Sequence, residues 1–109
     1  DQVGTPTYAQ DLADSVVEII EADMLSRTGI YNYTDEGVCS WYDLAKEVND
    51  LMNHDCNVVP CGSEEYPVKA QRPAYSVLNK KKFKETFGID IPHWRDSLYC
   101  FAEDFKRGN

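Results

Sequence analysis

Four stretches of this chain carry apolar residues at helical spacing, whereas only two short stretches have the composition of strands. The predicted order is helix, strand, helix, strand, loop, helix, helix. Two strands are too few for a complete doubly wound sheet. The sequence also contains no G-x-G-x-x-G motif and no P-loop, so it predicts no dinucleotide or triphosphate cradle. We therefore expect a small mixed α/β domain with about four helices and a few short strands.

The first two predicted helices begin at capping residues. Thr7 and Gln10 have the spacing of a capping box, and so do Ser40 and Asp43. Each helix carries one apolar stripe that we expect to face the core. The first stripe consists of Leu12, Ala13, Val16, Val17 and Ile20, and the second consists of Trp41, Leu44, Ala45, Val48 and Leu51 or Met52.

The last two predicted helices also have recognisable ends. Asn79 can cap the third helix and Gly88 can end it, while Pro92 suits the first turn of the fourth. Cys100 lies within the apolar pattern of the fourth helix, and we expect it to be buried. The other residues expected to face inward are Phe83, Phe87, Trp94, Leu98, Phe101 and Phe105.

Residues 29–34 and 57–60 are the two predicted strands. Residues 29–34 alternate and are rich in aromatic side chains, and residues 57–60 are apolar and stop at a proline. The chain before the first helix is expected to be extended, because Pro6 restrains Thr5. Residues 63–72 contain turn residues without a clear period, and we expect a loop there.

Charge is distributed unevenly along this chain, whose net charge is -8. Residues 1–55 contain 12 acidic and 2 basic side chains, whereas residues 56–109 contain 7 acidic and 9 basic ones. The acidic balance argues against a nucleic-acid partner. We interpret the lysines at 80–84 as a solvated helix face, with a local anion site as the alternative. Arg72 fits that alternative best, because Pro73 keeps the preceding backbone extended and the side chain can be held rigidly.

The sequence carries no recognisable membrane or export signal. No apolar run approaches the roughly 20 residues that span a bilayer, and no signal-peptide pattern is present. The four cysteines are irregularly spaced, so we expect reduced thiols in a cytoplasmic protein. A zinc site from His54, Cys56 and Cys61 is less favoured because it lacks a second pair of ligands. Since the chain begins at Asp1 rather than Met, we expect it to be processed or part of a longer protein.

Tyr42 and Lys46 form a tempting catalytic pattern. Their Y-x-x-x-K spacing places a phenol and an ammonium on one helical face, as in short-chain dehydrogenases. Because the chain has no nicotinamide site, we interpret them as an ordinary surface pair. His54 and His93 have no nucleophile placed beside them, and no acidic cluster has metal-ligand spacing. The sequence therefore predicts no catalytic residue and no metal site.

Two segments, residues 1–7 and 71–79, are more polar and restrained than folding alone requires. The first precedes a helix N-terminus, where an anion or a sugar hydroxyl can dock. The second combines Arg72 with the hydroxyl groups of Tyr75 and Ser76. Together they could hydrogen-bond a polyhydroxylated anionic ligand. The alternative is that both segments are structured loops without a ligand.

Five motifs, in order along the chain, resemble those of the dTDP-4-dehydrorhamnose reductases, a family of extended short-chain dehydrogenases. As a set they span nearly the whole chain and are highly specific. The motifs are residues 1–8 with 11–13, residues 29–31, residues 37–42, residues 72–78, and residues 87–89 with 92–98.

The resemblance implies a parent enzyme that reduces dTDP-4-dehydro-L-rhamnose with NADPH or NADH, giving dTDP-L-rhamnose for surface polysaccharide. Residues 1–109 would be a single C-terminal substrate-binding domain that holds no cofactor itself. The Rossmann domain, with the cofactor site and the catalytic Tyr-x-x-x-Lys, would lie outside this chain. The resemblance leaves a homodimer open. It implies that Arg72 faces the nucleotide diphosphate, and the other expected substrate contacts are Gln2, Gly4, Thr5, Pro6 and Tyr75.

A non-catalytic regulatory subunit is the alternative function. The same fold serves in the beta subunit of methionine adenosyltransferase, which binds a dinucleotide and steers a partner enzyme. The motifs at residues 37–42 and 92–98 favour the reductase. A free-standing module that binds the dTDP-sugar by itself is a third alternative, and it requires binding tighter than millimolar by this chain alone.

Overall fold

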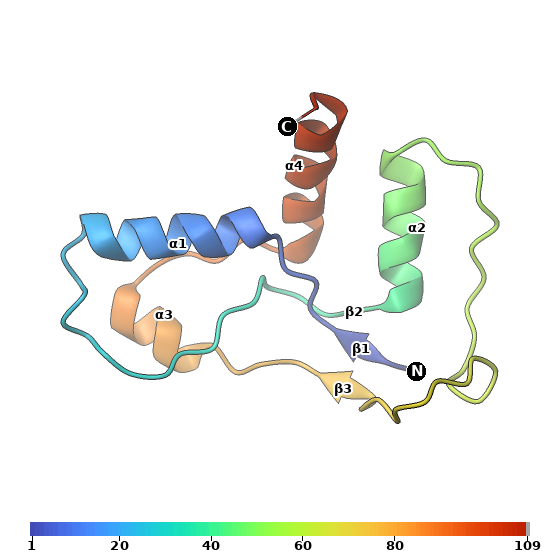
Figure 1. The fold of residues 1–109 in the computed structure, drawn as a ribbon, viewed down its shortest axis with the longest axis horizontal. Helices are drawn as coiled ribbons and strands as arrows, with labels where there is room; N and C mark the ends of the chain where they lie inside the picture. The colour runs from blue at the N-terminus through green and yellow to red at the C-terminus, as the bar shows by residue number, and fades with distance from the viewer. Residues whose placement is uncertain (109) are drawn as a thin grey trace.

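The computed structural model describes residues 1–108 and contains four helices and three short strands (Figure 1). This confirms the predicted mixed α/β class. No helix within these residues is long and apolar enough to cross a membrane. The helices are α1 (Ala9–Glu21), α2 (Trp41–Leu51), α3 (Lys81–Phe87) and α4 (Trp94–Lys106), and the strands are β1 (Val3–Gly4), β2 (Cys39–Ser40) and β3 (Tyr75–Ser76).

The three strands form one small sheet in the order β2-β1-β3. β1 runs antiparallel to β2 and parallel to β3, so the sheet joins three parts of the chain that are far apart in sequence. A Cβ on Gly4 would lie 3.3 Å from the Ser76 backbone oxygen, so the close pairing of β1 with β3 suits a glycine. The paired residues are Val3 with Ser40, Gly4 with Cys39, Val3 with Tyr75, and Gly4 with Ser76.

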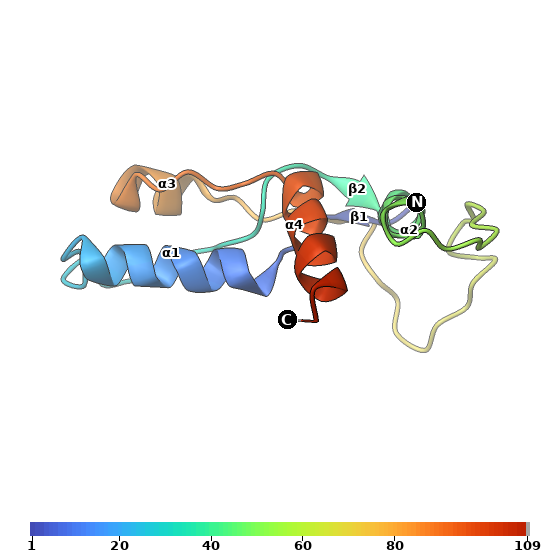
Figure 2. The same ribbon diagram turned by 90° about the horizontal axis from the view of Figure 1, so that it is seen from above.

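The molecule is flat and elongated, with principal extents of 48 × 36 × 21 Å. α1 and α3 lie at one end in separate layers, and α4 follows in the middle (Figures 1 and 2). α2 lies beyond the sheet at the other end. A long connection, residues 53–74, leaves α2 and loops outside it before reaching β3. This end of the molecule therefore has an outer wall built from loop.

The main apolar core lies around α3. Phe83 and Phe87 are buried there with Ile89, as predicted for the two phenylalanines. Tyr31 packs on Phe87 with ring centroids 4.7 Å apart, and Tyr33 packs on Phe83 at 5.2 Å. The loop before β2, through Tyr31 and Tyr33, and α1, through Ile19, thus pack on the same cluster around α3.

Residues 29–34 do not form the predicted strand. Their alternation does place Tyr31 and Tyr33 against the core while Ile30 is 87% exposed. Within the described chain, however, no strand lies beside them to complete a ladder of backbone hydrogen bonds. The predicted strand is therefore wrong, although the alternation does place the two tyrosines against the core. Residues 57–60 are also loop rather than strand, while β3, which was not predicted, is only two residues long.

The predicted inward face of α1 is wrong. Leu12, Val16, Val17 and Ile20 are 44–52% exposed. The packed face carries Ser15, which is buried, and Ile19, which contacts the α3 core. Among residues 1–108, α3 and the 31–35 loop cover only that narrower face, so the broader apolar stripe of α1 remains open to solvent.

α4 follows its prediction at its beginning only. Trp94 is buried as expected, but Phe101 and Phe105 are 42% and 59% exposed. Ser97 and Ala102 take the buried positions of this helix instead. Cys100, predicted to be buried, is exposed. The helix rests on its neighbours through a stripe of small side chains, which a search for large apolar residues does not find.

The predicted capping box of α1 is absent, and that of α2 is confirmed. α1 begins two residues later than predicted, so Thr7 accepts a hydrogen bond from the Asp35 backbone N–H at 3.2 Å instead of capping the helix. At α2, the Asp43 N–H donates to Ser40 Oγ at 3.0 Å, and the Ser40 N–H donates to Asp43 Oδ2 at 2.9 Å. The Ser40 N–H and the Ser40 hydroxyl both donate to the Asp43 carboxylate, and these two bonds lower the pKa of that carboxyl.

The predicted ends of α3 are largely right, whereas α4 begins after Pro92 and not at it. Asn79 Oδ1 accepts from the Lys81 N–H at 2.9 Å, and Gly88 ends α3 in the left-handed region with φ 63°. At α4 the cap is His93, whose Nδ1 accepts from the Arg95 N–H at 3.2 Å. The histidine thus has a structural role at the beginning of this helix.

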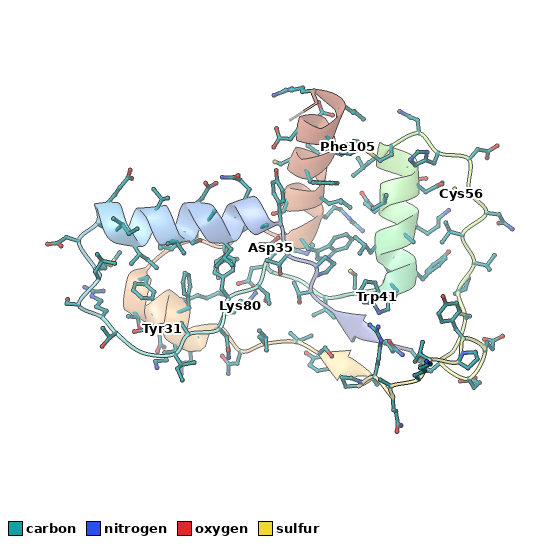
Figure 3. All side chains as sticks on the ribbon, in the orientation of Figure 1. Tyr31, Asp35, Trp41, Cys56, Lys80 and Phe105 are labelled. Atoms are coloured by element: carbon teal, nitrogen blue, oxygen red, sulfur yellow. The ribbon has the colours of Figure 1, made fainter. Side chains whose placement is uncertain are left out.

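A buried polar cluster links the loop before β2 to α3. Asp35 is fully buried, and its Oδ2 accepts from the Tyr8 backbone N–H at 3.0 Å. Lys80 Nζ donates to the Asp35 carbonyl oxygen at 2.7 Å and pairs with Glu36 at 3.2 Å (Figure 3). Lys84 also pairs with Glu36. The interpretation of this lysine run as a solvated face is therefore wrong for Lys80, which is only 8% exposed.

Replacing Asp35 by asparagine should change how stability depends on pH. Burial raises the pKa of the Asp35 carboxyl above its ordinary value of 3.8. The folded state therefore binds this proton more tightly than the unfolded state, and its contribution to stability is lost as pH rises through the folded pKa. Asparagine keeps an acceptor for the Tyr8 N–H and does not ionise.

Urea unfolding of both proteins across the acidic to neutral range checks this. Relative to Asp35→Asn, we expect the free energy of unfolding of the wild type to fall as pH rises above 3.8. A difference between the two proteins that does not vary with pH would contradict the assignment of a raised pKa to Asp35.

Candidate functional site

Two hollows share one rim at the beginning of α2. The loop-side hollow, about 490 Å³, lies between α2 and residues 58–68. The sheet-side hollow, about 380 Å³, lies between β1, α2 and residues 72–76. The side chains that line both are Gln2, Ser40, Trp41 and Arg72.

The sheet-side hollow brings together most of the residues predicted to contact a ligand. Tyr75 is the exception: it is 67% exposed and lines neither hollow. Its neighbour Ser76 faces the sheet-side hollow instead, because successive side chains of a strand point to opposite faces. The predicted residues that line this hollow are Gln2, Gly4, Thr5, Pro6 and Arg72.

The sheet positions these residues. β1 is the central strand, so the chain from Gln2 to Pro6 passes between β2 and β3 before turning into α1. Thr5 Oγ1 donates to the Gly37 carbonyl oxygen at 2.7 Å, which fixes the turn that leaves the strand. The N-terminal segment is therefore held by pairing on both sides.

Arg72 is the one basic side chain that lines both hollows. It makes no ion pair with a carboxylate among residues 1–108, so its charge is available to a ligand. A planar guanidinium can donate two parallel hydrogen bonds to phosphate oxygens. Lys69 joins Arg72 in a neighbouring outer hollow but lines neither of the two described above. The arrangement suits an anion at the junction of the hollows.

The outer wall of the loop-side hollow is held by the N-terminus of the described chain. Ser63 donates to Asp1 twice, from its backbone N–H at 3.0 Å and from its hydroxyl at 2.7 Å. Gln2 Nε2 donates to the same Ser63 hydroxyl at 3.0 Å. These three bonds join residues about sixty positions apart and keep residues 58–68 facing α2.

Trp41 is the site residue that the sequence prediction placed in the core. It is 64% exposed and lines both hollows, and Figure 3 shows it at the beginning of α2 beside β1. The sequence feature that could have indicated this role is the position of Trp41 directly after the Ser40 cap. A side chain in the first turn can point toward the preceding strand rather than along the apolar stripe that follows.

The cysteines and the possible metal ligands lie mostly outside the two hollows, with Cys61 lining the loop-side hollow. Among residues 1–108, no group of three or more His, Cys, Asp and Glu side chains could hold a metal ion. The four cysteines are free thiols. Burial raises the pKa of the Cys39 thiol, so this side chain stays protonated and behaves as a small apolar residue. The side chains that line the two hollows offer hydrogen-bonding groups, the Arg72 cation and apolar surface, all of which can bind a ligand.

A model of the RmlD substrate binding domain matches residues 1–107, which include both hollows and all the side chains that line them. The chain belongs to the RmlD substrate binding domain family. This domain therefore contains the N-terminal segment, the Ser40 cap and Arg72 within a single recognised unit. The match confirms the resemblance that the five motifs indicated.

Curated relatives agree with this family. The RmlD domain described here is 38% identical to the spore coat polysaccharide biosynthesis protein SpsK of Bacillus subtilis, over 95% of this chain and 35% of that protein. It is 34% identical to a dTDP-4-dehydrorhamnose reductase of Burkholderia thailandensis, over 95% of this chain and 40% of that protein. The chain thus spans well under half the length of the curated relatives that it matches.

Solved structures share the fold. A dTDP-4-dehydrorhamnose reductase from Clostridium acetobutylicum superposes with a TM-score of 0.86 at 40% identity, over 97% of this chain and 37% of that chain. The reductase from Bacillus anthracis, solved in complex with NADP, superposes with a TM-score of 0.76 at 31% identity, over 95% of this chain and 35% of that chain. The small sheet and four helices are therefore the architecture of the RmlD domain in complete reductases.

Proposed function

We propose that this chain is the C-terminal, sugar-nucleotide-binding part of a reductase that converts dTDP-4-dehydro-L-rhamnose to dTDP-L-rhamnose. The observation that carries the proposal is an unpaired Arg72 at the junction of two hollows, in a chain of the RmlD substrate binding domain family. Relatives named dTDP-4-dehydrorhamnose reductase support the substrate. SpsK, named for spore coat polysaccharide biosynthesis, supports a role of the product in surface polysaccharide.

Arg72 binds the diphosphate in this proposal. The diphosphate is the most strongly charged part of a dTDP-sugar, and Arg72 is the cation that both hollows share. The sugar lies toward the sheet-side hollow, where Gln2 and Thr5 offer side-chain hydrogen-bonding groups and Gly4 allows close approach of the backbone. Tyr75, which the sequence predicted as a substrate contact, is left out of the proposed contacts because it lines neither hollow.

The cofactor and the catalytic groups belong, in this proposal, to a Rossmann domain outside residues 1–109. The sequence has no G-x-G-x-x-G turn between a strand and a helix, which supports a cofactor site in another part of the protein. The structure with NADP among the relatives supports NADPH, with NADH as the alternative. The exposed apolar stripe on α1 supports a chain that packs against further protein. A cytoplasmic location suits the four free thiols.

A reductase assay on the full-length protein tests this function. Incubation with dTDP-4-dehydro-L-rhamnose should oxidise NADPH or NADH and yield dTDP-L-rhamnose, measured by loss of absorbance and by product chromatography. A dTDP-sugar without the 4-keto group is the control and should give no oxidation. Absence of turnover with either cofactor, in a protein that binds the dinucleotide, would favour the regulatory-subunit alternative.

A further inference from the structure

We propose that the loop-side hollow binds the planar base of the nucleotide, stacked on Trp41, and that Asp1 is a positioning residue that holds the opposite wall. This inference rests on the proposed function and deepens it by assigning the part of the ligand that Arg72 does not recognise. It concerns side chains that the sequence pattern placed in the core or left without a role.

The lining of the loop-side hollow suits a flat, weakly polar ring. Its walls are largely apolar, with Val58, Val59 and Pro60 on the loop and Ala45 on α2. Trp41 forms part of the rim and is 64% exposed, whereas Trp94, the other tryptophan of the chain, is buried. An exposed indole beside apolar walls offers a stacking surface for a base.

The position of Arg72 identifies the kind of ring. Arg72 lines the loop-side hollow together with Trp41, so one ligand can contact both side chains. A nucleotide, the ligand of the proposed function, can place its phosphates on the guanidinium and its base on the indole, since the two are joined through one sugar. A purely apolar ligand would leave the Arg72 charge without a partner.

Asp1 lines the loop-side hollow and holds its outer wall in place. The wall formed by residues 58–68 has no strand or helix of its own, and its turn is tied back by the two hydrogen bonds from Ser63 to the Asp1 carboxylate. Gln2, which lines both hollows, adds a third bond to the same hydroxyl. Loss of the Asp1 carboxylate would let the wall move away from Trp41 and widen the loop-side hollow.

Calorimetric titration of the full-length protein, saturated with NADP, tests the stacking surface with two probes, dTDP and inorganic pyrophosphate. Trp41→Ala should lower dTDP affinity about ten- to a hundredfold and leave pyrophosphate affinity nearly unchanged. Trp41→Phe keeps an aromatic ring and should recover most of the loss. Tyr99→Ala is the matched control, because it removes a ring that is 56% exposed on α4, and it should change neither affinity.

The same titrations test the wall. Asp1→Ala should weaken dTDP binding without weakening pyrophosphate binding, and Asp1→Asn, which keeps one acceptor oxygen for Ser63, should lie between it and the wild type. Wild-type dTDP affinity in Trp41→Ala would overturn the proposal and leave the proposed function standing. Equal losses for both probes would also overturn it, because Trp41 would then support the site as a whole. A wild type that binds neither probe would overturn the proposed function as well.

Discussion

Arg72→Ala in the full-length protein is expected to raise KM for the dTDP-sugar about ten- to a hundredfold, with a smaller change in kcat. The estimate follows from the loss of charge-assisted hydrogen bonds to a phosphate group, worth about 1.5–3 kcal/mol. The effect falls on KM because Arg72 lies among binding groups and not among catalytic ones, so it holds substrate and transition state alike. Steady-state kinetics over a range of dTDP-sugar concentrations measures both constants.

Two further variants separate the role of Arg72 from general electrostatics. Lys69→Ala removes a neighbouring positive charge that lines the outer hollow but neither of the two central ones, so KM should change little. Arg72→Lys keeps the charge but loses the planar fork, and it should recover only part of the affinity. If Arg72→Ala left KM at its wild-type value, the diphosphate role would be wrong.

Gly37→Ala is expected to destabilise the protein by roughly 2–5 kcal/mol, through backbone strain and overpacking together. Gly37 has φ 90°, where side chains are rarely tolerated. A Cβ there would lie 2.3 Å from His93 Nε2 and 2.8 Å from Trp94 Cδ1. Trp94 is buried and cannot move aside without disturbing the packing, and movement of His93 would break the cap hydrogen bond that it accepts from the Arg95 N–H.

Gly88→Ala is the matched control for this variant. Gly88 also has a positive φ, 63°, but a Cβ there would meet nothing within 4 Å. It should therefore lose only the conformational part, about 1–2 kcal/mol. Urea unfolding of the two variants and the wild type measures the difference. Equal losses in both variants would show that the close contact with His93 and Trp94 does not contribute.

The sequence predicted the local structure well where one residue determines it. The Ser40 cap with Asp43 and the end of α3 at Gly88 each depend on neighbours within about one turn. Predictions failed where the structure of a segment depends on contacts with a distant part of the chain. The 29–34 segment has the alternation of a strand, but whether it pairs depends on another strand lying beside it.

The exposed faces of α1 and α4 show a second limit. An apolar stripe such as that of Val16 and Ile20 predicts that a face is covered, but it does not say by what. Within residues 1–108 it remains exposed, while Ser15 and Ser97 are buried on the packed faces. A part of a larger protein can carry a stripe for a surface that the part itself does not bury.

The candidate site was predicted in outline from Gln2, Thr5 and Arg72, which the fold does bring to one hollow. Trp41 was missed because its position on α2 fits the apolar stripe of that helix, so the sequence alone does not separate a core residue from a site residue. The Asp1–Ser63 contact was missed because no local rule joins two residues 62 positions apart. Lys80 was misassigned for the same reason, since its partners Asp35 and Glu36 lie in a separate loop.

The most direct test of the sugar-nucleotide site is a crystal structure of the full-length protein with dTDP and NADP bound. We expect the diphosphate oxygens within hydrogen-bonding distance of the Arg72 guanidinium, with the nucleotide filling the two hollows that share this side chain. A dTDP molecule bound elsewhere, with Arg72 turned to solvent and both hollows free of ligand, would contradict the assignment of this domain as the sugar-nucleotide-binding part.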